Sequence, residues 1–369
     1  MHILRIANFV SPTSGGIKTA LRHWGEGYVE RGHRVSLIIP EDSVNQSVTH
    51  EPQGVVYRVP ARRIAGTGYS LIFSRYGLSQ LMGFIRPDTI EVSDRSTLRW
   101  TGLWAARQAS QVGSIMISHE VVTGVLTSRS PLPLRRAQDL ADAINRRSAR
   151  DFDTIACPSA FAAEEFARIG ADAQVVPLGV DLETFAPHGA PAARDGRPLR
   201  LIHCGRLSRE KNPRLSIATV CELRRRGVDV QMTVLGHGPM RDVLMREAAE
   251  LPVTFHPYIT DRRDLADAMT GADVAIAPGP VETFGLAALE AMACGVPTVC
   301  PREGALSEVV GSGGIVAEST PAACADAVLD LARRPDARMQ ARAQAAKFTW
   351  AASADRMLEL HAATRGRST

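Results

Sequence analysis

Short apolar segments rich in Val and Ile alternate along the chain with longer segments whose apolar residues recur at helical spacing. This alternation predicts strand-helix-strand units that build a parallel sheet covered by helices on both faces. The expected strands of the first half are Ile3–Ala7, Val35–Ile39, Thr89–Val92, Ser114–Ser118 and Thr154–Pro158, with a helix at Gly16–Arg31. Those of the second half are Leu199–Cys204, Val230–Leu235, Val274–Ala277 and Thr298–Cys300, with a helix at Pro213–Arg226. The pattern indicates an α/β protein with two doubly wound domains.

A segment poor in large apolar residues separates the two halves. Residues 187–198 are mostly Pro, Ala, Gly and charged residues, which is typical of an exposed linker. We therefore expect an N-terminal domain at 1–186, a second domain at 199–345 and a C-terminal helix at 346–369. The apolar stripe of that last helix must dock on another part of the protein. A length of 369 residues suits two domains.

Composition narrows the class of protein. With 45% hydrophobic and 22% charged residues, the chain is neither disordered nor fibrous. No apolar run approaches the roughly 20 residues that cross a bilayer, and Met1 leads into an apolar strand without a basic leader. The six cysteines show no CxxC spacing and lie in apolar surroundings. We expect a cytoplasmic protein.

Ligands of an open parallel sheet bind beyond the carboxyl ends of its strands. The residues that follow each strand are therefore the first candidates for binding. After the first strand, Gly15 and Gly16 open a helix whose N-terminal amides suit a phosphate group. The alternative is a plain turn, because neither a P-loop nor a dinucleotide motif is present.

Cations follow the first strand of the second half. Gly205 precedes Arg206, and Lys211 stands directly before the expected helix at Pro213. Cations are unfavourable at a helix N-terminus unless an anion is bound, so a diphosphate is the expected ligand. An exposed basic loop is the alternative. Gly236, at the end of the next strand, predicts a turn near the nucleotide.

The strongest motif is the segment Pro278–Pro297. A Pro/Gly loop carries Glu282, and an apolar helix then runs from about Gly285 to Gly295. Glu290 lies inside this apolar helix, where an unpaired carboxylate is costly. Ribose hydroxyl groups would provide a partner, and an internal salt bridge is the structural alternative.

These motifs resemble those of family 4 of the retaining glycosyltransferases, over nearly the whole chain. The E-x7-E pattern is matched by Glu282 and Glu290, and GR-x-x-x-EKN by Gly205–Asn212. The resemblance implies the GT-B architecture of two facing Rossmann-like domains, with a C-terminal helix that crosses back to the first. It also implies the bound groups: donor-sugar hydroxyls at Glu282 and the backbone of Phe284, Gly285 and Leu286; ribose at Glu290; diphosphate at Arg206, Lys211 and Gly16.

The resemblance also bears on catalysis. His119, at the end of a first-domain strand, matches the position of a histidine close to the reacting sugar. Neither half should catalyse alone, because Gly16 and His119 come from one half and the cations from the other. Fixed cations at the leaving diphosphate make a metal unnecessary, so we expect no metal and no cofactor. Asp151-Phe152-Asp153 mimics a metal-binding DxD string, but we interpret it as structural.

The acceptor is expected at Arg62–Pro87. This segment mixes arginines with aromatic and aliphatic residues, which suits a peripheral membrane site on the inner face of the cell membrane. Its candidate contact residues are Arg62, Arg63, Tyr69, Arg75 and Tyr76. An ordinary core-packing helix is the alternative.

Phosphatidylinositol mannosyltransferases of the family have a basic and aromatic segment of this kind, suited to a membrane surface. The resemblance therefore favours transfer of mannose from GDP-mannose to a membrane glycolipid or glycan, with no nucleic acid as partner. Three other readings remain open from the sequence: a UDP-sugar-dependent glucosyl- or N-acetylglucosaminyltransferase with a soluble acceptor, a nucleotide-sugar epimerase, and a non-catalytic nucleotide-sugar-binding protein.

Overall fold

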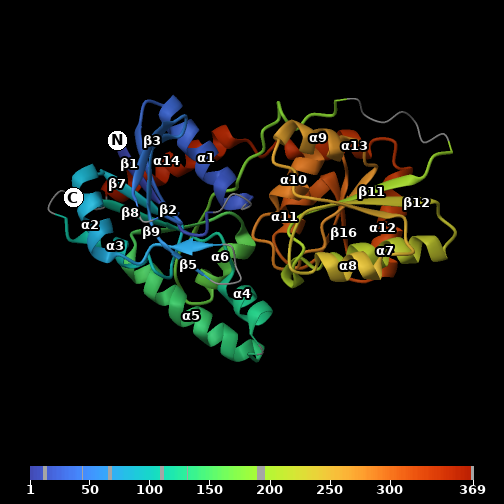
Figure 1. Ribbon diagram of the computed structural model, residues 1–369, viewed down its shortest axis with the longest axis horizontal. Coiled ribbons are helices and arrows are strands. Elements are labelled where there is room, and N and C mark those ends of the chain that lie inside the picture. Colours follow the sequence, from blue (N-terminus) through green and yellow to red (C-terminus); the bar gives the residue numbers. More distant parts are fainter. Residues whose placement is uncertain are drawn as a thin grey trace. The chain divides into compact units, whose positions relative to one another are not determined.

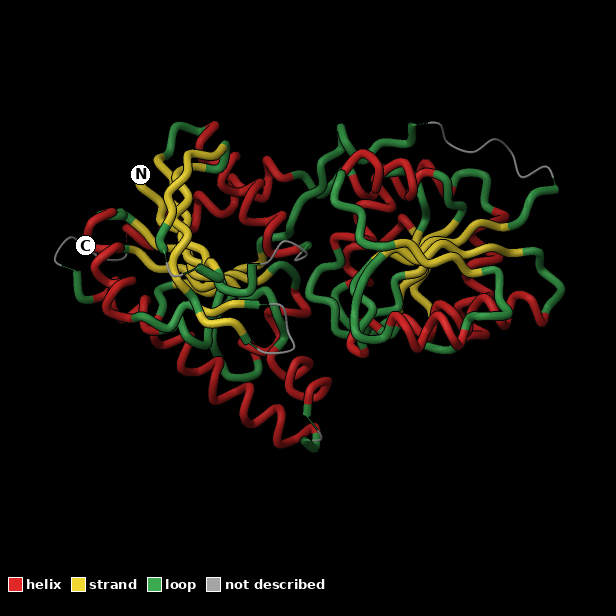
Figure 2. Tube along the Cα trace, in the orientation of Figure 1, coloured by secondary structure: helices red, strands yellow, loops and turns green. Residues whose placement is uncertain are grey.

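The computed structural model describes residues 1–10, 15–43, 45–64, 69–108, 112–130, 132–188 and 196–366. Two compact units divide the chain. The N-terminal unit comprises Met1–Thr123, Leu132–Leu178 and Trp350–Thr369, and the C-terminal unit comprises Gly124–Pro131 and Gly179–Thr349. Figures 1 and 2 show a strand-and-helix layer structure in each.

An eight-stranded sheet forms the centre of the N-terminal unit, in the order β10-β9-β8-β7-β1-β2-β4-β3. All neighbours in it are parallel except β3, which pairs antiparallel with β4 at one edge. Its strands are β1 (His2–Ile6), β2 (Arg34–Glu41), β3 (Ser47–Glu51), β4 (Gly54–Pro60), β7 (Thr89–Val92), β8 (Gly113–Ile117), β9 (Thr154–Cys157) and β10 (Gln174–Val175). Two short strands, β5 (Arg62–Arg63) and β6 (Ser70–Leu71), form a separate hairpin.

Helices cover both faces of this sheet, and α1, α2 and α5 each turn an apolar side inward. The helices that precede Gly179 are α1 (Gly16–Glu30), α2 (Arg75–Ile85), α3 (Trp100–Ala106), α4 (Val122–Arg129), α5 (Leu134–Asp151) and α6 (Ala160–Ala167). Most of α4 belongs to the C-terminal unit. On one face the core contains Met82 of α2, Ala105 of α3 and Phe166 of α6. On the other face, α1 packs against the last helix, α14 (Trp350–Gly366).

A six-stranded parallel sheet forms the centre of the C-terminal unit, in the order β13-β12-β11-β14-β15-β16. Its strands are β11 (Leu199–Cys204), β12 (Val230–Leu235), β13 (Val253–His256), β14 (Val274–Ile276), β15 (Thr298–Pro301) and β16 (Gly314–Ala317). Its helices are η1 (Arg209–Lys211), α7 (Pro213–Arg225), α8 (Arg241–Glu247), α9 (Arg262–Thr270), α10 (Leu286–Ala293), α11 (Leu306–Val310), η2 (Gly311–Gly313), α12 (Pro321–Arg333) and α13 (Ala337–Ala345). In Figure 1, α7, α8 and α12 lie on one face, and α9, α10 and α13 lie on the other.

The boundary between the units lies earlier than residues 187–198. The second unit begins at Gly179, because the segment that follows is packed into it. Phe185 is completely buried, and the guanidinium of Arg342 donates to the carbonyl groups of Leu182 and Phe185 at 2.9 and 2.5 Å. Part of the expected linker, 189–195, lies outside the described residues.

The last helix also begins later than residue 346. It starts at Trp350 and belongs to the N-terminal unit, which confirms that the C-terminal helix returns to the first half. No helix among the described residues combines the length and the apolar character needed to cross a membrane.

Candidate active site

The topology of the C-terminal unit creates a binding position between β11 and β14. The strand order reverses there, because β12 and β13 extend the sheet to one side of β11 and β14 to β16 to the other. Loops that follow adjacent strands diverge at such a point and leave a crevice at their carboxyl ends. A pocket occupies this position, lined by Cys204, Gly205, Lys211, Gly279 and Glu282 among others. The structure thus brings the expected cation and carboxylate to one crevice.

Two glycines of the site are required by close backbone approaches. A Cβ atom on Gly236 would lie 2.0 Å from the carbonyl oxygen of Gly205, so no other residue fits between these two strand ends. Gly285 has φ of 95°, in the left-handed region that favours glycine, and directly precedes α10. A Cβ atom there would lie 2.3 Å from Leu306. Gly285 lines the pocket directly, and Gly236 lies against Gly205, which also lines it.

Lys211 and Glu282 form an ion pair in the pocket. The Lys211 Nζ atom lies 2.7 Å from Glu282 Oε1, and about a quarter of each side chain is exposed. Lys211 ends η1, so its charge lies directly before α7, as the sequence indicates. The sequence predicts that a bound anion neutralises the charge of Lys211. In the structure, the Glu282 carboxylate neutralises it. Arg206 is exposed near the start of the same loop.

Phe284, Leu286 and Glu290 surround the start of α10. Phe284 is buried and makes an edge contact with Phe348, with ring centroids 5.7 Å apart. Leu286 is the first residue of the helix. Glu290 is buried and accepts a hydrogen bond from Nη2 of Arg262, the first residue of α9. The internal salt bridge named above as the alternative is therefore present, with a partner that the sequence analysis did not identify.

His119 lies at the carboxyl end of β8 in the N-terminal unit. Its Nε2 atom is 3.1 Å from the Ser93 hydroxyl group, which follows β7. Burial lowers the pKa of His119 to about 4, so the imidazole is neutral at pH 7. On the neighbouring strand end, the amide of Asn8 donates to Asp94 at 2.8 Å. These polar groups meet at the point where this sheet also reverses its strand order, between β1 and β7.

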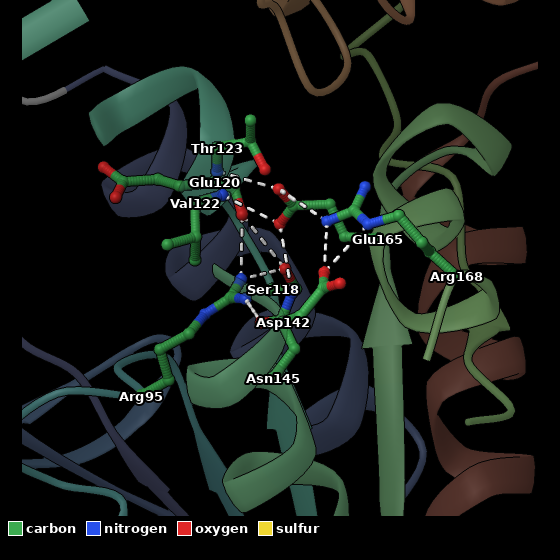
Figure 3. A network of polar contacts seen from close by, with 9 residues as sticks. All are labelled: Arg95, Ser118, Glu120, Val122, Thr123, Asp142, Asn145, Glu165 and Arg168. Carbon is green, nitrogen blue, oxygen red and sulfur yellow. Dashed lines mark hydrogen bonds and ion pairs between the residues drawn. The ribbon is translucent and has the colours of Figure 1, made fainter. Parts of the chain in front are cut away.

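A network of polar contacts holds the loop that carries His119 (Figure 3). Arg95 donates to the hydroxyl group of Ser118, to the carbonyl of Glu120 at 2.8 Å and to Asn145 at 2.5 Å. The buried carboxylate of Glu165 accepts from the backbone amides of Val122 and Thr123, both at 2.8 Å, where α4 begins. The residues on both sides of His119 are therefore fixed. Sequence reasoning did not find this network, because its members are far apart in the chain.

The helix expected after the first strand is present as α1, and residues 11–14 before it lie outside the described residues. Gly15 directly precedes α1 and Gly16 is its first residue, and no acidic side chain occupies the first turn. Open space surrounds the Cβ position of Gly15.

Two family models match the chain. The model described as Glycosyl transferase 4-like domain matches residues 15–180, and the model described as Glycosyl transferases group 1 matches residues 198–334. The chain is 42% identical over 368 residues to the "GDP-mannose-dependent alpha-(1-6)-phosphatidylinositol dimannoside mannosyltransferase" of Mycobacterium tuberculosis, covering 97% of this chain and 95% of that protein. The chain belongs to the group 1 glycosyltransferases. A "D-inositol 3-phosphate glycosyltransferase" of Pseudarthrobacter chlorophenolicus is 28% identical over 96% of this chain and 91% of its own length.

Solved structures of glycosyltransferases share the fold. Sucrose-phosphate synthase from Thermosynechococcus elongatus has a TM-score of 0.77 and 21% identity, with 98% of each chain covered. The catalytic domain of starch synthase IV from Arabidopsis thaliana has a TM-score of 0.75 and 14% identity, with 99% of each chain covered. The GT-B fold expected from the sequence is confirmed.

The acidic string at residues 151–153 of this glycosyltransferase has structural partners. Asp151 ends α5 and pairs with Arg99, and Asp153 accepts hydrogen bonds from the backbone amide and the hydroxyl group of Ser114, both at 2.8 Å. Both carboxylates therefore tie the end of a helix to neighbouring elements. Among the described residues, no three His, Cys, Asp or Glu side chains gather as a metal site.

The expected acceptor segment of the enzyme contains both a core-packing and an exposed face. Leu78, Met82 and Ile85 of α2 are buried in the unit. On the opposite side Tyr76 and Phe84 are each 78% exposed. The other candidates lie close by in the chain: Arg62 and Arg63 form β5, Arg75 begins α2, and the Tyr69 ring packs edge-on against Phe9, with centroids 5.7 Å apart.

Proposed function

We propose that this glycosyltransferase transfers mannose from GDP-mannose, with retention of anomeric configuration, to a mannosylated phosphatidylinositol at the membrane surface. The observation that carries the proposal is the 42% identity, over 97% of the chain, to a relative named as a GDP-mannose-dependent phosphatidylinositol dimannoside mannosyltransferase. A second set of relatives is named for inositol 3-phosphate. An inositol-containing acceptor is common to both names.

The donor fits the crevice of the C-terminal unit. In our proposal the diphosphate binds Arg206 and Lys211, beside Gly236. The Lys211–Glu282 pair then opens, because the diphosphate replaces the carboxylate at Lys211. Glu282, freed from the lysine, accepts hydrogen bonds from the mannose hydroxyl groups together with the backbone of 284–286, and Glu290 accepts from ribose.

The reaction needs stabilisation of two developing charges. The bond between mannose C1 and the diphosphate oxygen breaks, and a new bond forms between C1 and the acceptor oxygen on the same face of the sugar. The proton of the acceptor hydroxyl group passes to the departing phosphate oxygen. Arg206 and Lys211 stabilise the negative charge on the diphosphate, so the proposal needs no metal ion. His119, neutral at pH 7, is a hydrogen-bonding partner for the sugar rather than a charge.

The exposed face of α2 supports a membrane-bound acceptor. Phe73, Tyr76 and Phe84 are 51, 78 and 78% exposed, and the guanidinium of Arg62 lies 6.0 Å from the ring centroid of Phe73. Aromatic rings beside arginines suit the boundary between lipid tails and anionic headgroups. We propose that α2 attaches the enzyme peripherally to the inner face of the cell membrane.

A radiolabelled donor panel tests the proposal. The purified enzyme is mixed with vesicles that contain phosphatidylinositol mannosides and with GDP-mannose, UDP-glucose or UDP-N-acetylglucosamine, each labelled in the sugar. We expect label in the lipid fraction from GDP-mannose only, at a rate that excess EDTA leaves unchanged. Transfer from a UDP sugar would contradict the proposed donor, and transfer only to soluble acceptors would contradict the lipid acceptor. Loss of activity with EDTA would contradict the metal-independent step.

A further inference from the structure

Arg262 connects α9 to α10 and to the segment that carries Phe185. It is the first residue of α9, and its guanidinium lies 4.7 Å from the ring centroid of Phe185. Its Nη2 atom donates to Oε1 of Glu290 on α10. A guanidinium over an aromatic face is attracted to the ring, so the arginine is held from two sides. No motif in the sequence identifies this residue.

The surroundings keep Arg262 in place. Phe185 is completely buried. Arg342 binds the Phe185 carbonyl oxygen at 2.5 Å and the Ala293 carbonyl oxygen, at the end of α10, at 2.6 Å. The start of α9 is fixed by Asp261, whose side chain accepts from the backbone amides of the second and third residues of the helix at 2.8 and 3.1 Å. These contacts therefore hold Arg262 in one position relative to α10.

The charge on Glu290 depends on this arginine. The Glu290 side chain is 8% exposed, and burial raises the pKa of its carboxyl group while the Arg262 guanidinium opposes the rise. Glu290 lies on α10, and Ala287 and Ala288 of the same helix line the pocket together with Cys204 at the end of β11. Within the described residues, Oε2 of Glu290 makes no hydrogen bond, and Arg262 engages only Oε1.

We infer that Arg262 is the positioning residue for ribose recognition. It binds one oxygen of Glu290 and holds the carboxylate in place, and the other oxygen is left to accept the ribose hydroxyl groups. The inference rests on the proposed function, in which a nucleoside diphosphate sugar occupies this crevice.

Calorimetric titration tests the inference with GDP and 2′,3′-dideoxy-GDP as probes, and with the corresponding uridine pair. The wild-type enzyme should bind GDP about tenfold or more tightly than the dideoxy compound, because hydrogen bonds to a charged group are lost. In Arg262→Met that preference should fall to about twofold or less. The matched control is Arg263→Met, which removes the same charge from the next, exposed residue of α9.

A pH series separates positioning from a merely structural role. Without Arg262 the pKa of Glu290 rises further, so the residual preference of Arg262→Met for GDP should increase with pH as the carboxyl group ionises. Arg262→Lys keeps the charge and should recover part of the preference, and it replaces the methionine variant if that variant does not fold.

The outcomes are distinct. A wild-type preference that persists in Arg262→Met overturns the inference and leaves the proposed function intact. A wild-type enzyme that binds both compounds equally overturns the inference together with the proposed ribose contact of Glu290, but not the proposed transfer of mannose. Tighter GDP binding by Arg262→Met also overturns it, since the arginine would then compete with ribose. Failure of the wild-type enzyme to bind any of the four compounds overturns the proposed function itself.

Discussion

At the scale of single residues, the proposed donor crevice and the helix α10 beside it carry opposite charges that already neutralise one another. Lys211 pairs with Glu282 and Arg262 with Glu290. The sequence identified three of these four residues, because strand ends and an apolar helix with an internal carboxylate are visible along the chain. It did not reveal the pairing, which depends on which strand ends are adjacent in the folded sheet.

Lys211→Met should lower kcat/KM for GDP-mannose by about a hundredfold, because a fixed cation at the leaving diphosphate is lost. Steady-state kinetics with the phosphatidylinositol mannoside acceptor measure the effect. Arg209→Met is the matched control, since Arg209 is exposed in the same η1 turn. Equal kcat/KM values for Lys211→Met and the wild-type enzyme would show that Lys211 does not act on the donor.

His203 predicts a pH dependence of stability. This histidine is 3% exposed, and burial lowers its pKa from 6.5 to about 4. Between these two values the unfolded chain binds more protons than the folded one, so stability is complete above pH 6.5 and decreases as the pH falls. The loss due to His203 at pH 5 is about 2 kcal/mol.

Thermal unfolding at pH 7 and pH 5 measures this effect. We expect the difference in melting temperature between the two pH values to be smaller in His203→Asn than in the wild-type protein. An unchanged difference would mean that His203 titrates normally in the folded state.

At the scale of elements, the strands of both sheets were predictable wherever Val and Ile cluster. Thr89–Val92, Leu199–Cys204 and Val230–Leu235 have the expected bounds. The β3–β4 pair was missed, because most of its residues are only partly buried and β3 is largely polar. The segment Arg62–Pro87 contains β5, β6 and α2. The buried side of α2 agrees with the core-packing alternative, and the membrane role of its exposed side stays a prediction.

The exposed face of α2 should bind vesicles that contain anionic lipid. Tyr76→Ser and Phe84→Ser should each weaken vesicle binding about tenfold, because each removes a large aromatic side chain from the interface. Co-sedimentation with vesicles measures this. Met339→Ser is the control, since Met339 is 68% exposed on α13 of the other unit. Binding that does not depend on anionic lipid, or that survives both aromatic changes, would contradict the membrane proposal.

At the scale of the whole molecule, the chain enters the C-terminal unit near Gly179 and returns to the N-terminal unit at Trp350. The return was predictable, since an apolar stripe on a terminal helix requires a docking face. The boundary between the units was not predictable. The sequence near Phe185 does not show that Arg342 binds the Phe185 carbonyl group and holds this segment in the second unit.

Removal of α14 should unfold the N-terminal unit. Met357 and His361 are completely buried there, the His361 ring lies 3.4 Å from Glu91, and Trp24 donates to Ser353 at 2.8 Å. A protein that ends at Thr349 should lose one part of its thermal transition in circular dichroism, while a control that ends at Gly366 should match the full chain. An unchanged transition in the shorter protein would contradict the role of α14.

The most direct test of the account is the ¹H NMR spectrum of the lipid product formed from GDP-α-mannose and phosphatidylinositol mannoside. The account predicts a new mannosyl residue in α linkage, formed as GDP-mannose is consumed. A β-linked product would contradict the account. So would the release of free mannose or a free epimer without lipid product, and so would binding of GDP-mannose without its consumption.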